Sequence, residues 1–244
     1  MFERVKSTVK AITAKAATRD PFEIQRLLFQ DRDQPIIFDV GAYIGEITRT
    51  YRSVLPRAII YSFEPSPDSF NQLRRLSHEP GIKTYQLAVS DEVGKTTFHV
   101  NADPSCNSFF PRPKNGRYYA PQAQMVDSLA VETTSIDHFC STEGIRRIEI
   151  LKLDVEGAEL NVLRGADHTL SQEAIDLIYT EALFVSLYDG GCLFYELSGL
   201  LGGYGYTLLN LYNLKSAKNG QLRWGNAIFL SPRMRASFER TSLP

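Results

Sequence analysis

The sequence is poor in cysteine, with 3 in 244 residues. Cys106, Cys140 and Cys192 lie 34 and 52 residues apart (140 − 106 and 192 − 140). An odd number at these spacings fits neither a zinc site nor the dense pairing of a disulfide-stabilised secreted domain. We therefore expect free thiols and a reducing, cytoplasmic environment.

An excess of charge and a long apolar run are also missing. The chain has 27 basic and 28 acidic residues, a net charge of −1, so no global positive field would recruit nucleic acid. No apolar run approaches the roughly 18 residues that a membrane-spanning helix needs. No apolar segment follows the basic N-terminus as it would in a secretory signal. We expect no nucleic-acid partner and no transmembrane segment.

The N-terminal segment, residues 1–34, is predicted to be a helical extension. Phe2, Val5, Val9 and Ile12 recur at helical spacing, and basic residues occupy the other side. We expect this amphipathic helix to pack on its own domain or on a second copy in a homodimer. The alternative is peripheral contact of its basic face with a membrane surface.

What the sequence does contain is an alternation of strand and helix patterns within one domain, residues 35–244. Apolar runs end at polar or acidic residues, and helical patterns follow most of them. Such alternation predicts an α/β fold, a mostly parallel sheet with helices on both faces. The predicted strands cover 35–40, 58–64, 82–90, 148–156 and 175–183, with a further one at 96–100, and the predicted helices cover 44–55, 67–76, 158–170 and 193–201.

The C-terminal part of the domain differs from this alternation. Two β-rich runs, 206–214 and 224–231, are joined by a polar turn that contains Asn219-Gly220. Asn-Gly favours the tight turn of a hairpin. We expect a terminal hairpin that adds an antiparallel strand to the parallel sheet.

Residues 101–127 interrupt the pattern with four prolines and two adjacent aromatic pairs, Phe109-Phe110 and Tyr118-Tyr119. A structureless stretch of this length in a compact domain is usually functional or disordered. Disordered segments are depleted in aromatic residues, so we predict a lid or substrate-binding loop. The alternative is a mobile surface insertion.

The stretch "IIFDVGAYIGEITRTY", residues 36–51, indicates a ligand site. Open parallel sheets bind ligands beyond the carboxyl ends of their strands, and there the chain places Asp39, Gly41 and Gly45. A dinucleotide fingerprint would need glycine at Tyr43, and a carboxylate would repel pyrophosphate. Asp39 suits a ligand's ammonium group instead, and the following helix N-terminus suits its carboxylate. We expect a ligand that joins an amino acid to a nucleoside.

Glu64 supports this expectation. It ends the second predicted strand, 25 residues after Asp39 (64 − 39), and Pro65 follows it. An acidic side chain in this place can accept hydrogen bonds from both ribose hydroxyls. The joint pattern predicts a nucleoside-binding site between the first two strands.

At this point the chain resembles a known family, the FkbM-type S-adenosylmethionine-dependent methyltransferases. The blocks "FDVGAYIGEIT", "YSFEPSPDSFNQL", "LAVSD", "SIDHF", "ILKLDVEGAELNVLRGA" and "NAIFL" follow the family's order over residues 35–231. The resemblance implies a class I methyltransferase (Rossmann-like) fold: a seven-stranded, mostly parallel sheet with a C-terminal antiparallel hairpin. It also implies S-adenosylmethionine as the cofactor and methyl transfer, usually to a hydroxyl of a sugar, glycan or other small molecule.

The resemblance extends to individual cofactor residues. The glycine loop and the acid after the second strand match the family's blocks, and the segment that ends the third strand lies by the adenine in this fold. The cofactor-binding residues that the resemblance implies are Asp39, Gly41, Ala42, Tyr43, Gly45, Glu64, Pro65, Val89, Ser90, Asp91 and Asp154.

Three acids are the predicted catalytic residues: Asp154, Glu156 and Glu181. Like charges at the ligand end of neighbouring strands cost repulsion and desolvation, which indicates function. Glu159 lies in the first helical turn, where a carboxylate is favoured, and is interpreted as structural. We predict that a carboxylate acts as a metal-free general base toward the acceptor hydroxyl. The alternative is a cluster that holds a divalent cation.

Two other functions stay open from the sequence. A nicotinamide-dependent Rossmann oxidoreductase is disfavoured by Tyr43, which stands where a phosphate-facing glycine is needed. A non-catalytic methyltransferase-fold interaction domain would bind the cofactor without turnover. No code in residues 101–127 identifies the acceptor.

Overall fold

A computed structural model describes residues 20–113 and 124–242, with side chains as far as residue 237. The helix predicted for the first part of the chain lies outside these residues. None of the helices in the described ranges is long and apolar enough to cross a membrane.

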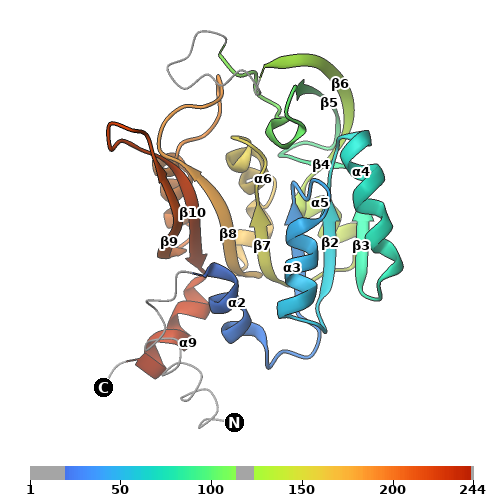
Figure 1. The fold of residues 1–244 in the computed structure, drawn as a ribbon. Coiled ribbons are helices and arrows are strands. Elements are labelled where there is room, and N and C mark those ends of the chain that lie inside the picture. The colour runs from blue at the N-terminus through green and yellow to red at the C-terminus, as the bar shows by residue number, and fades with distance from the viewer. Residues whose placement is uncertain (1–19, 114–123, 243–244) are drawn as a thin grey trace.

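The central element is a seven-stranded sheet in the order β3-β2-β1-β7-β8-β10-β9 (Figure 1). All neighbouring pairs are parallel except those of β10, which runs antiparallel to both β8 and β9. The predicted sheet with its C-terminal hairpin is confirmed. The strands are β1 (Ile36–Val40), β2 (Ile59–Phe63), β3 (Ile82–Tyr85), β7 (Ile148–Leu153), β8 (Ile175–Leu183), β9 (Thr207–Ser216) and β10 (Leu222–Leu230).

Alternating side chains of the strands build a core on each face of the sheet, because successive residues of a strand point to opposite sides. Ile37, Ile60 and Ile150 belong to one core cluster, and Phe38 and Leu151 belong to the other. The first cluster is covered by α2 (Pro21–Phe29), α3 (Glu46–Val54) and α4 (Pro67–Leu73), and the second by α5 (Ile136–Glu143), α6 (Glu159–Arg164), α7 (Asp167–Ser171) and α8 (Phe194–Gly203). The helices on both faces are therefore as predicted.

Helix α2 packs into the domain. Ile24, Leu27 and Phe29 are buried, and the Tyr51 hydroxyl of α3 donates to Gln25 Oε1 at 2.8 Å. The described part of the predicted extension is thus held against the sheet. A further helix, α9 (Pro232–Ser242), follows β10.

The third predicted strand, residues 82–90, is wrong as a single element. Strand β3 ends at Tyr85, and Ala88–Val89 form β4 in a second sheet, where β4 and β5 (Gly94–Asn101) flank β6 (Met125–Thr134). Strand β6 was not predicted, because its first four residues are exposed and carry no buried face. The predicted loop 101–127 is correspondingly shorter, and a 3₁₀ turn (η2, Pro104–Cys106) lies within it.

The predicted helix 158–170 is also interrupted. It divides into α6 and α7 next to Gly165, where a Cβ would lie 2.1 Å from the Ser90 carbonyl oxygen. The backbone of this turn approaches the end of β4 so closely that only glycine fits. Helix α5, which begins at the capping residue Ser135, was not predicted.

Candidate cofactor and active site

A cavity of about 340 Å³ opens at the carboxyl ends of β1, β2 and β7. Beyond β1 the chain order of the sheet reverses, and open α/β sheets bind ligands at such a point. The smaller sheet lies above the carboxyl ends of these strands in the view of Figure 1. Phe98 of its strand β5 lines the cavity. Among the predicted site residues, the cavity is lined by Gly41, Ala42, Tyr43, Glu64, Pro65, Val89, Asp154 and Glu156.

The loop after β1 approaches its neighbours closely. Gly41 has φ +73°, and a Cβ there would lie 1.8 Å from the Asp154 carbonyl oxygen. The backbone N–H groups of Gly41 and Ala42 both donate to the Phe63 carbonyl, at 3.1 and 2.9 Å. Tyr43 also has a positive φ, +50°. The loop is therefore held between β2 and β7, with glycine required at position 41.

Gly45 contacts different neighbours from Gly41. It precedes α3 with φ +87°, and a Cβ there would lie 2.5 Å from Leu76 Cδ1. Gly45 does not line the cavity. The structure therefore places it at the packing of the helix start against the leucines that follow β2, and its predicted contact with the cofactor stays a prediction.

Glu64 lies at the cavity wall with 6% of its surface exposed. Its two carboxylate oxygens accept hydrogen bonds from the backbone N–H groups of Tyr43 and Ser66, both at 2.9 Å. Burial disfavours the charged form more than these bonds favour it, and it raises the pKa of Glu64 to about 7. Each oxygen has a further lone pair that a ribose hydroxyl can use.

Asp39 does not line the cavity. It is fully buried, accepts a hydrogen bond from Thr48 Oγ1 at 2.7 Å, and lies 3.0 Å from Lys152 Nζ. Its charge is therefore compensated within the protein rather than presented to a ligand's ammonium. The carboxylate that faces the cavity at this edge is Asp154, whose side chain is 45% exposed.

Ser90 and Asp91 also lie outside the cavity lining. The Ser90 hydroxyl donates to Asp91 Oδ1 at 2.9 Å, and Asn161 of α6 lies against the same carboxylate. Their neighbours Ala88 and Val89 do line the cavity. The structure thus brings the apolar half of this segment to the cavity, and the adenine contact of its polar half stays a prediction.

Asp154, Glu156 and Glu181 converge as predicted, with carboxylate oxygens within 4.8 Å of one another. Burial and the neighbouring negative charges raise the pKa of Glu156 to about 8 and raise the pKa of Glu181 well above its ordinary value. Oε2 of Glu181 is buried and accepts no hydrogen bond from the described residues. Such a cluster can share a proton or bind a cation.

Glu159 plays the structural part expected of it. It is fully buried, and its Oε1 accepts a hydrogen bond from the Val155 backbone N–H at 3.1 Å. This bond closes the turn that leads from β7 into α6.

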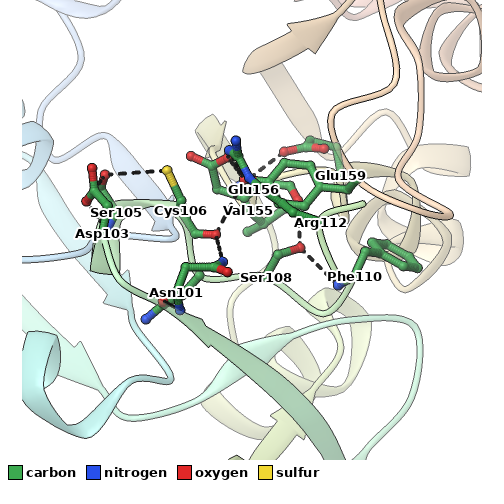
Figure 2. A network of polar contacts seen from close by, with 12 residues as sticks. Asn101, Asp103, Ser105, Cys106, Ser108, Phe110, Arg112, Val155, Glu156 and Glu159 are labelled. Carbon is green, nitrogen blue, oxygen red and sulfur yellow. Dashed lines mark hydrogen bonds and ion pairs between the residues drawn. The ribbon is translucent and has the colours of Figure 1, made fainter. Parts of the chain in front are cut away.

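A segment of the predicted loop reaches across to Glu156. Arg112 Nη2 lies 3.5 Å from Glu156 Oε2, and the Tyr188 hydroxyl donates to the same oxygen. The guanidinium group of Arg112 also lies over the Tyr188 ring, 4.4 Å from its centroid. We call residues 101–113 the strap; Figure 2 shows how Arg112 and Ser108 point from it toward Glu156.

The strap also holds the backbone of Glu156. Glu156 has φ +54°, a left-handed conformation that costs a side-chain-bearing residue about 1–3 kcal/mol unless its surroundings impose it. The buried Ser108 hydroxyl donates to the Glu156 carbonyl at 2.7 Å and accepts from the Phe110 N–H at 3.0 Å. The strap therefore fixes both the backbone and the carboxylate of a predicted catalytic residue.

Sequence reasoning assigned no role to four residues that the structure brings to the site: Lys152, Arg112, Ser108 and Tyr188. A signal existed only for Lys152, the one charged side chain at a buried position in the strand pattern "IEILKL". The other three carry no local signal, because their partners lie far away along the chain.

The matches to known proteins agree with this geometry. The family model described as "Methyltransferase FkbM domain" matches residues 39–208. The 2-O-methyltransferase NoeI of Sinorhizobium fredii is 29% identical over 167 residues, which cover 66% of this chain and 68% of NoeI.

Two further relatives are similar at the same level. The 31-O-demethyl-FK506 methyltransferase FkbM of Streptomyces tacrolimicus is 27% identical, covering 73% of this chain and 75% of FkbM. The hexuronic acid methyltransferase AglP of Haloferax volcanii is 27% identical, covering 65% of this chain and 61% of AglP. These matches favour methyl transfer over the nicotinamide-dependent alternative. The chain belongs to the FkbM methyltransferase family and is an S-adenosylmethionine-dependent methyltransferase.

Proposed function

We propose that the protein transfers the methyl group of S-adenosylmethionine to a hydroxyl of a sugar, glycan or other small molecule, with Glu156 as the general base. The observation that carries this proposal is the position of Glu156 at the cavity, with a pKa raised to about 8. A carboxylate of that pKa is a stronger base than an ordinary glutamate. The names of NoeI and FkbM specify O-methyl transfer, and that of AglP specifies a hexuronic acid.

The side chains that line the cavity carry the chemical groups that would bind S-adenosylmethionine. Glu64 offers carboxylate oxygens to the ribose, Ala88 and Val89 offer apolar surface to the adenine, and Asp154 offers a negative charge to the ammonium group. S-Adenosylmethionine supplies an electrophilic methyl group when it is bound there. Gly41 lines the cavity, and its lack of a Cβ lets the loop pass close to the backbone at the end of β7.

Glu156 would take the proton of the acceptor hydroxyl as the new carbon–oxygen bond forms. Arg112 and the Tyr188 hydroxyl hold Glu156 Oε2 on one side. Burial and the negative charge of Asp154 keep the proton affinity of Glu156 high. Proton transfer by a positioned base contributes about a hundred- to ten-thousandfold to a rate.

The test uses labelled methyl transfer from S-[methyl-³H]adenosylmethionine to a panel of glycosides, including a glucuronide, and to small-molecule extracts. Glu156→Gln should lower transfer by about a hundred- to ten-thousandfold while S-adenosylhomocysteine affinity stays unchanged. Glu132→Gln, an exposed glutamate paired with Lys95 in the small sheet, is the matched control. If Glu156→Gln transfers methyl groups at the wild-type rate, Glu156 is not the general base. If the wild-type protein binds the cofactor but transfers no methyl group to any probe, a non-catalytic domain is favoured.

A metal requirement is the competing mechanism at the same acids. Under the base mechanism, transfer should be unchanged after EDTA treatment. Loss of activity with EDTA and its recovery with magnesium would show that Asp154, Glu156 and Glu181 hold a cation instead.

Location and assembly belong to the same proposal. Cys106, Cys140 and Cys192 are all free, which supports a cytoplasmic, reducing environment. A homodimer and a peripheral membrane contact through the N-terminal segment remain predictions, to be checked by sedimentation and by vesicle flotation of the full chain.

A further inference from the structure

Lys152 is a buried cation at the wall of the candidate cofactor cavity. It stands on β7 beside Asp39 of β1, and its side chain is 4% exposed. Its ammonium group lies 3.0 Å from Asp39 Oδ1, donates to the Gly41 carbonyl at 2.9 Å and lies 3.5 Å from the Val40 carbonyl. Its donors are therefore directed at the end of β1 and at the first residues of the glycine loop.

Stability alone does not account for this ion pair. Removing two charges from water is costly, and buried pairs can often be replaced by apolar residues without loss of stability. An ammonium group can bind backbone carbonyls and neutralise a carboxylate at the same time, which an apolar side chain cannot do. Lys152 neutralises Asp39 and binds the Gly41 carbonyl of the glycine loop.

Lys152 also acts on Asp154. The Lys152 ammonium lies 3.8 Å from Asp154 Oδ2, whose side chain lines the cavity. Asp154 therefore keeps a nearby cation that favours its ionised form.

We propose that Lys152 is a positioning residue for the amino-acid end of the cofactor: it fixes the carbonyls of the glycine loop and holds Asp154 as the carboxylate that meets the cofactor's ammonium group. This inference depends on the S-adenosylmethionine site and not on the identity of the acceptor or of the base. It also assigns Asp39 as the counter-ion of Lys152 rather than a ligand contact.

Two cofactor analogues separate positioning from folding. S-Adenosylhomocysteine carries the amino-acid end, whereas 5′-methylthioadenosine lacks it but keeps the nucleoside. Lys152→Met should weaken S-adenosylhomocysteine binding by about tenfold or more, as expected for loss of a charge-assisted contact. The affinity for 5′-methylthioadenosine, measured by the same calorimetry, should change by less than about twofold, since Glu64 still serves the ribose.

A second variant distinguishes a selective loss of binding from misfolding. Asp39→Asn/Lys152→Met removes both charges and leaves no buried carboxylate unpaired, and we expect the same selective loss of S-adenosylhomocysteine binding. Lys83→Met is the matched control: this lysine is half-exposed and donates to the Tyr61 hydroxyl, away from the cavity. Equal loss of both ligands in the double variant, unchanged binding of both, or failure of the double variant to fold would show a purely structural ion pair and overturn the proposal.

Discussion

The affinity of the protein for its cofactor should depend on pH through Glu64. This carboxyl is 6% exposed, and burial raises its pKa to about 7. In the proposed site, ribose hydroxyls donate to the ionised form, so binding should favour the carboxylate and lower the pKa of Glu64 in the complex. By linkage, S-adenosylhomocysteine affinity should be highest above the pKa of the free protein and fall as the pH drops through it.

The magnitude follows from the two states of Glu64. Hydrogen bonds to a charged group contribute about 1.5–3 kcal/mol, which is roughly a ten- to hundredfold difference in affinity between the ionised and protonated forms. At about pH 6, one unit below the pKa, roughly a tenth of the free protein carries the carboxylate. The affinity should therefore fall between about fivefold and tenfold from pH 8 to pH 6.

Calorimetric titration with S-adenosylhomocysteine across this range, with Glu64→Gln in parallel, is the assay. The amide cannot ionise, so the variant should bind about ten- to a hundredfold more weakly than wild type at pH 8. Its affinity should also depend less on pH, while contributions of Glu156 and Glu159 remain in both proteins. The reasoning is refuted if the two proteins show the same pH dependence or if Glu64→Gln binds like wild type.

Three further outcomes are expected. Gly41→Ala should abolish S-adenosylhomocysteine binding in calorimetry and lower the melting temperature, because its Cβ would lie 1.8 Å from the Asp154 carbonyl oxygen; normal binding would contradict the geometry of the loop. Arg112→Gln removes a positive charge beside Glu156, so the ascending limb of the pH–rate profile should move to higher pH, whereas Arg112→Lys should leave it nearly in place. Replacing residues 114–123 by a short glycine-serine linker should change cofactor affinity by less than about twofold if this part of the predicted loop serves the acceptor; a lower transfer rate in the same variant would support a lid over the acceptor.

Much of the cavity lining could be predicted because its residues carry local signals. Glycine is required at position 41 because the residue has a positive φ and its backbone lies close to the end of β7. Glu64 directly follows a buried apolar run that is recognisable as a strand. Asp154 and Glu156 stand in the turn after another such run. Residues that act at the end of their own strand are visible in a one-dimensional pattern, because parallel strands bring their carboxyl ends to one edge.

The surroundings of Glu156 could not be predicted because they depend on long-range contacts. Glu156 meets Arg112 across 44 residues, Ser108 across 48 and Tyr188 across 32. No spacing rule relates such positions. The strap that brings Arg112 and Ser108 to the site starts in β5, whose partner β6 was itself not recognised.

The sequence by itself determined the type of fold and the position of the cavity, because strand periodicity, the glycine loop and the acid after β2 each impose a local conformation. Only the tertiary structure decided which carboxylate faces the cavity. Asp39 and Asp154 both follow the strand-end pattern, but Lys152, 113 residues from Asp39 (152 − 39), compensates Asp39 in the core and leaves Asp154 at the cavity. Two like residues thus take different roles, because the charge of a buried group depends on the partner that folding places beside it.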